Sequence, residues 1–127
     1  MNGYVTLQSY IIMTNTIEMS LMDAEERRMV EYIWNLIPEQ DRQGISPDDI
    51  LLVLDLMDDY LEDKGLLVDK GDEMEYLEGE VDETEQLDYI VKAVREDGRQ
   101  LSIVQIQLIM DGELQYGIEQ GYYTEED

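Results

Sequence analysis

One pattern of residues occurs twice in this chain, and the repeat limits the folds open to it more than any other feature. A stretch that begins at Glu31 aligns with one that begins at Asp88, with a single gap opposite Gly44. Such a repeat indicates two copies of one supersecondary unit that bury their apolar faces against each other. The pairs that are identical in the two copies are Tyr32/Tyr89, Ile33/Ile90, Glu39/Glu96, Arg42/Arg99, Gln43/Gln100, Ser46/Ser102, Ile50/Ile106, Leu52/Leu108, Asp55/Asp111, Tyr60/Tyr116 and Gly65/Gly121.

The first copy reads as two helices joined by a loop. Asp23 and Glu26 have the spacing of an acidic N-terminal cap, and apolar residues follow at helical spacing. Pro38 ends this helix because the residue before a proline is pushed out of the helical region. The pattern therefore predicts a helix over residues 23–37.

The second helix of this copy has the clearest signals in the chain. Ser46 is a typical N-cap, Pro47 suits the first helical position, and two acids follow in the first turn. Gly65 provides a left-handed C-terminal stop. Between these ends one apolar stripe is formed by Ile50, Val53, Leu54, Met57, Tyr60 and Leu61.

The second copy repeats this plan. Either Asp82 or Thr84 opens a helix, and Ser102 caps a last helix that ends before Gly121. Gly112 and Gly117 weaken that helix by roughly 1 kcal/mol each relative to alanine. Close packing of the backbone or a bend in the helix would each account for them.

We therefore expect a mainly α fold, an internally duplicated helical hairpin packed as a four-helix pseudo-twofold domain. An up-down bundle and two crossed hairpins both fit the pattern, and the segment between the copies reads as a short β-hairpin or an irregular acidic linker. The expected ranges are an N-terminal extension, partly disordered, over 1–22 and one helical domain over 23–127, comprising repeat one (23–69), acidic linker (70–81) and repeat two (82–127). The residues expected inside are Trp34, Leu54, Met57, Ile90, Ile109 and Met110.

A winged-helix topology is an alternative, because a capped helix followed by a hairpin resembles the recognition helix and wing of that DNA-binding class. The helix that would read DNA carries seven acids from Asp48 to Asp63 and no basic residue before Lys64. A protein with this topology would therefore have no DNA-binding surface there.

The charge of the chain restricts its partners. The chain has 32 acidic and 8 basic residues, a formal net charge of -24. Such a field repels nucleic acids and anionic membranes and favours encounter with basic proteins. A well-solvated surface is the simpler explanation of the excess.

The composition also removes most catalytic chemistry. The chain has no cysteine and no histidine, which excludes thiolate and imidazole catalysis and the usual zinc ligands. A calcium-binding loop of the EF-hand type with Ile45 at its eighth position would have Pro38, Gln40 and Arg42 at its first, third and fifth positions, where oxygen ligands are needed. We therefore expect neither an enzyme nor a bound metal or cofactor.

The candidate partner-binding residues come first from an acidic stripe on the helix that starts at Ser46. Asp55, Asp58, Asp59 and Glu62 fall at helical spacing, although like charges at that spacing cost a helix roughly 0.2 to 0.5 kcal/mol per pair. Four residues of helix rise about 6 Å, so such a row of acids could imitate nucleic-acid phosphates.

The second copy contributes the remaining candidates, which are Asp111, Tyr116, Tyr122 and Tyr123. The tyrosines either cover the core or form a partner-binding patch. The matched acids Asp55 and Asp111 either bind a partner, hold the matched Arg42 and Arg99, or lie on the surface as solvated charges.

The function we expect from these features is that of a non-enzymatic interaction module that binds a basic protein surface. The expected surfaces are the helix from Ser46 to Lys64 and the acidic linker from Asp69 to Asp88. The alternatives are a nucleic-acid mimic that inhibits a DNA-binding protein and a carboxylate-based metal-dependent enzyme. Direct binding to nucleic acid or to a membrane is not expected, and the sequence leaves open whether the chain forms a homo-oligomer.

The first residues lack the basic region and the small-residue cleavage site of a signal peptide. The chain also has no apolar run of about 18 residues, the length a membrane span needs. We therefore expect a cytoplasmic protein, with Met13 as an alternative start.

Overall fold

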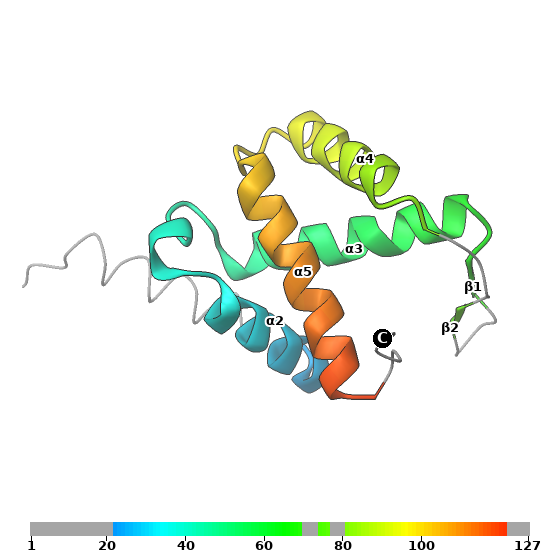
Figure 1. The fold of residues 1–127 in the computed structure, drawn as a ribbon, viewed down its shortest axis with the longest axis horizontal. Helices are drawn as coiled ribbons and strands as arrows, with labels where there is room; N and C mark the ends of the chain where they lie inside the picture. Colours follow the sequence, from blue (N-terminus) through cyan, green and yellow to red (C-terminus); the bar gives the residue numbers. More distant parts are fainter. Residues whose placement is uncertain (1–21, 70–73, 77–80, 122–127) are drawn as a thin grey trace, which may run out of the picture.

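The computed structural model describes residues 22–69, 74–76 and 81–121. The segment 1–21, where an extension was expected, the larger part of the linker, and Tyr122 and Tyr123 lie outside these ranges. Within them the fold is mainly helical, as the sequence predicted (Figure 1). The elements are α2 (Ala24–Leu36), the 3-10 helix η1 (Glu39–Asp41), α3 (Pro47–Asp63), β1 (Leu67–Asp69), β2 (Met74–Tyr76), α4 (Glu83–Glu96) and α5 (Ile103–Glu119).

The helices begin at the caps that the sequence predicted. Asp23 and Asp82 each accept a hydrogen bond from the backbone N–H three residues on, so Asp82 rather than Thr84 opens α4. Ser46 and Ser102 each form a complete capping box with the residue three positions later. These side chains satisfy backbone donors that a helix start otherwise leaves unpaired.

Glycines follow the ends of α3 and α5. Gly65 has a φ of 74° and Gly121 a φ of 79°, the left-handed region that costs other residues a steric penalty. After Gly65 the chain enters β1, which pairs antiparallel with β2 so that Leu67 is opposite Tyr76.

The helices cross one another rather than lying parallel. Figure 1 shows α5 running across α3, from the end of α4 to α2. The packed pairs are α2 with α5, α3 with α4, α2 with α3, α3 with α5 and α4 with α5. The fully buried side chains at the centre are Val30, Ile33, Ile37, Ile50, Val53, Ile90, Val94, Ile106 and Ile109.

Half of the six side chains expected in the interior are buried. Ile90, Ile109 and Met110 are buried, at most 7% exposed. Trp34, Leu54 and Met57 are only partly buried and pack against the outside of the core. Trp34 lies at the edge of the stripe formed by Val30, Ile33 and Ile37. Leu54 and Met57 line a hollow between the helices, which leaves part of each side chain open to solvent.

Two pairs of tyrosines join elements from opposite copies. The rings of Tyr32 on α2 and Tyr116 on α5 meet edge to face, with centroids 5.3 Å apart. The rings of Tyr60 on α3 and Tyr89 on α4 meet in the same way at 5.5 Å. Tyr60 and Tyr116 are buried by these contacts.

Polar contacts also connect each loop to the opposite copy. The Gln105 amide, part of the capping box of α5, donates to the carbonyls of Asp41 (3.0 Å) and Gln43 (2.8 Å). Arg99 donates to Asp49, in the capping box of α3, at 2.6 Å and to Asp48 at 2.7 Å.

The matched arginines do not hold the matched acids. Arg99 pairs with Asp48, Asp49 and Asp97. Arg42 donates from Nε to the Ile37 carbonyl at 2.9 Å and lies over the Trp34 ring. The hypothesis that they hold Asp55 and Asp111 is therefore wrong, because Arg99 is engaged by the start of α3 and by Asp97, and Arg42 by the end of α2.

Candidate functional site

A hollow of about 250 Å³ opens where α3 lies beside the start of α2 and the middle of α5. Its floor is apolar and its rim is acidic. Within the part of the chain that the structure describes, no Lys or Arg side chain lines it. We call it the acidic hollow; its floor is Met29, Leu51, Leu54, Met57 and Leu61, and its rim is Asp23, Glu25, Glu26, Asp55, Asp58 and Glu113.

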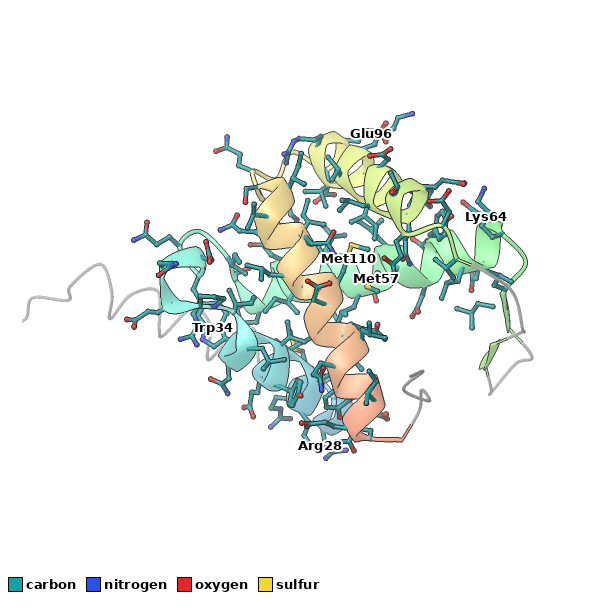
Figure 2. The ribbon with its side chains drawn as sticks, viewed as in Figure 1. Arg28, Trp34, Met57, Lys64, Glu96 and Met110 are labelled. Atoms are coloured by element: carbon teal, nitrogen blue, oxygen red, sulfur yellow. The ribbon has the colours of Figure 1, made fainter. Side chains whose placement is uncertain are left out.

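The spacing of residues on α3 explains how apolar and acidic side chains share the hollow. Leu51, Leu54, Asp55 and Asp58 follow one another at i, i+3, i+4 and i+7, which places them on one face of a helix. Asp55 and Asp58 therefore lie at the border of the apolar stripe. Figure 2 shows Met57 of α3 and Met110 of α5 near the place where these two helices cross. Of these two methionines, Met57 lines the hollow.

The N-terminal turn of α2 provides half of the rim. Asp23 caps the helix and accepts from the Glu26 backbone N–H at 2.8 Å, which orders this first turn. The helix dipole favours acids in a first turn, so Glu25 and Glu26 are at positions where negative charge is tolerated.

The carboxyl groups of the rim affect one another. The pKa of Glu26 is raised by a hydrogen bond with the Asp23 carboxyl, then by burial and by the Asp23 charge. The pKa of Asp23 is lowered, chiefly by the backbone N–H of Glu26. An acid with a raised pKa is in surroundings that disfavour its negative charge, so a cation brought to this rim would be stabilised.

Asp55 is also in surroundings that disfavour its negative charge, although its side chain is exposed. Partial burial beside the apolar floor raises its pKa, and the charges of Asp59 and Asp48 add to the effect. The excess of negative charge at the hollow is therefore a property of α3 as well as of α2.

The structure separates the acids that were predicted as one stripe. Asp55 and Asp58 line the acidic hollow, whereas Asp59 and Glu62 are exposed on α3 outside it. Asp111 is exposed on α5 and accepts from the Gln107 amide at 2.9 Å. Tyr116 is only 5% exposed against Tyr32, so it offers a partner little surface.

Four rim acids were not among the predicted site residues: Asp23, Glu25, Glu26 and Glu113. The sequence signalled the first three only as a helix start. Glu113 is more than 80 residues further along the chain, and the crossing of α5 over α3 brings it to the hollow. No spacing rule within one helix could have found it.

A second, more open hollow lies between the end of α3 and α4, and its three acids face two lysines, so most of its charge cancels. Lys64 forms an ion pair with Glu85, and the Tyr89 hydroxyl donates to Asp63 at 3.3 Å. Lys92 also lines it. This surface offers a charged partner less than the acidic hollow does.

In residues 22–69, 74–76 and 81–121, no group of three or more acids is arranged to hold a metal ion. No helix in those ranges has the length and apolar character to cross a membrane. Comparison of the chain with protein-family models, curated proteins and solved structures found no match.

Proposed function

We propose that this protein is a non-enzymatic interaction module that binds a basic surface of another protein. The observation that carries the proposal is the acidic hollow, where six carboxylates surround an apolar floor and no Lys or Arg contributes to the lining that the structure describes. A rim that carries only negative charge attracts a positively charged partner and speeds their encounter. The apolar floor adds affinity that salt does not screen.

The proposal is tested by charge reversal at four acids of α3, those predicted as one stripe. The variant Asp55→Lys, Asp58→Lys, Asp59→Lys, Glu62→Lys is compared with the unaltered protein in cross-linking and pull-down from cell lysate at roughly physiological salt. We expect the unaltered protein to recover a basic protein that the variant does not. Recovery of the same proteins by both, or of none, would contradict the proposal.

Competition with duplex DNA separates this function from that of a nucleic-acid mimic. A partner held through its own DNA-binding face is released by DNA at concentrations that saturate that face. A partner held through another basic surface stays bound. Release would assign the role of inhibitor instead.

For the scaffold of this surface, we propose that the two copies of the repeat pack about a pseudo-twofold axis. The tyrosine pairs support this, because Tyr32 matches Tyr89 in the repeat and Tyr60 matches Tyr116. Each pair thus joins the first helix of one copy to the second helix of the other, with similar geometry.

A second set of contacts supports the same symmetry. The Tyr89 hydroxyl donates to Asp63, and Tyr32 has its pKa raised by burial and then by a hydrogen bond with Glu119. Asp63 and Glu119 occupy matching positions of the repeat.

Double-mutant cycles test the symmetry. With leucine substitutions, Tyr32/Tyr116 and Tyr60/Tyr89 should each show a coupling of about 0.5 to 1.5 kcal/mol in urea unfolding. The pair Tyr32/Tyr60, which is not in contact across the proposed axis, should show about none. Coupling in only one of the two contacting pairs would contradict equivalent packing.

A further inference from the structure

The acidic hollow has the size of a socket for a side chain rather than of a site for a metabolite. Its volume of about 250 Å³ lies below the roughly 300 to 1,000 Å³ of typical small-molecule sites. Its floor is formed by five apolar side chains from two helices, which can surround an inserted aliphatic or aromatic group. An anchor of this kind gives an interface most of its binding energy.

The rim defines what must surround that anchor on the partner. Acids stand on the hollow's border from three directions: Asp23 and Glu26 on α2, Asp55 and Asp58 on α3, and Glu113 on α5. In a helix, residues three or four positions from an apolar anchor lie about 5 to 6 Å from it. Lysines or arginines at those positions would reach the rim while the anchor enters the floor.

From this geometry we infer that the acidic hollow binds a basic helix of another protein, with one large apolar residue as anchor and Lys or Arg three or four positions before and after it. The inference rests on the proposed function and narrows its partner to this class. Helix-in-groove docking suits the place, because the walls of the hollow are themselves helices.

Charge argues against two other occupants. A second copy of this chain brings a net charge of -24 and is repelled. The chain's own residues 1–21 contain apolar side chains but no Lys or Arg, so they do not match the rim. A basic helix of another protein satisfies both the floor and the rim.

The test uses a synthetic helical peptide of about five turns, with one central leucine, lysines three and four positions before and after it, and alanine elsewhere. A control peptide keeps every lysine and replaces the central leucine by serine. Affinities for the full chain are measured by isothermal titration calorimetry at roughly 150 mM salt. We expect the leucine peptide to bind at least about tenfold more tightly than the control, because its anchor is buried.

Two protein variants with the same change in charge locate the binding site. Asp55→Asn with Asp58→Asn alters the rim, whereas Asp59→Asn with Glu62→Gln alters neighbouring acids outside the hollow. We expect the first variant to weaken binding of the leucine peptide about fivefold or more and the second less than about twofold. Thermal unfolding of both variants confirms that they are folded.

The outcomes separate the two proposals. Equal affinity for both peptides, or an equal loss of affinity in both variants, would overturn the inference. The proposed function, binding to a basic protein surface, would not be contradicted by either result. Binding that appears only when residues 1–21 are removed would show that the chain's own segment occupies the hollow, and would overturn it as well. Absence of binding of either peptide would contradict the proposed function itself.

Discussion

At the scale of single residues, Gly112 shows how one position can fix the distance between two helices. A Cβ atom at this position would lie 3.0 Å from Cγ2 and 3.1 Å from Cγ1 of Ile33, which is fully buried. The sequence left close packing and a bend open as reasons for this glycine. The approach of α5 to α2 provides the physical reason, and it was invisible in the sequence because Ile33 is on a distant segment.

Gly112→Ala should therefore destabilise the protein even though alanine favours a helix. The overlap with Ile33 costs about 1 to 3 kcal/mol, and the gain in helix propensity returns about 1 kcal/mol. We expect the midpoint of urea unfolding to fall. Gln115→Ala, an exposed position in the same helix, is the control and should change little. A Gly112→Ala variant more stable than the original would disprove the close contact.

Asp55 gives a prediction about pH. Its pKa is raised in the folded protein above the ordinary 3.8, so the folded state binds a proton more readily than the unfolded chain. The contribution of this group to stability therefore falls as pH rises through 3.8 and beyond. Asp55→Asn should stabilise the protein at neutral pH, by less than about 1 kcal/mol because the side chain is exposed.

The difference between Asp55→Asn and the unaltered protein should shrink as the pH is lowered past 3.8, where both side chains are neutral. Urea unfolding at several pH values measures it. Glu62→Gln, outside the hollow, controls for the change in net charge. A variant that is less stable at neutral pH would show that the Asp55 carboxylate has a favourable partner instead.

At the scale of helices and loops, Arg99 connects the loop of the second copy to the start of α3. It donates to Asp49 and Asp48 on α3 and to Asp97 in its own loop. Its pKa is raised above the ordinary value by these hydrogen bonds, Asp97 first. The contact fixes α3 and the second copy together at a capped helix end.

Arg99→Ala should lower the free energy of unfolding by about 1 to 3 kcal/mol, since it leaves two first-turn carboxylates without their shared donor. Arg99→Lys should recover only part of the loss, because one ammonium cannot replace the guanidinium fork. Asp97→Asn, which removes only the partner within the loop, should cost less than Arg99→Ala. Equal stability of Arg99→Ala and the unaltered protein in urea would refute this role.

The helices themselves were predictable because local chemistry determines them. Capping side chains at Asp23, Ser46 and Ser102, and glycine stops at Gly65 and Gly121, act within a few residues of one another. Sequence patterns of that range are readable without knowledge of the fold. The apolar stripes were also readable from the sequence, although only half of the residues expected in the core are buried.

At the scale of the whole molecule, the acidic hollow could not be predicted, because its parts meet only through tertiary packing. Leu54 and Met57 read as core residues in the sequence, and Asp55 and Asp58 as an outer stripe. The crossing of α2, α3 and α5 leaves the first pair as a floor and turns the second pair into a rim. The apolar stripe and the acidic stripe, which looked separate in the sequence, thus contribute to one surface.

The central claim is that an apolar anchor of a basic helix enters the acidic hollow. Methionine-methyl NMR tests it most directly, because Met29 and Met57 line the hollow whereas Met110 is buried and does not. A lysine-rich helical peptide with tryptophan as its anchor is titrated into the protein labelled at its methionine methyl groups. The account predicts ring-current shifts of the Met29 and Met57 methyl signals, assigned by Met→Leu substitution, and little change at Met110. Saturable binding that leaves the Met29 and Met57 signals in place would contradict it.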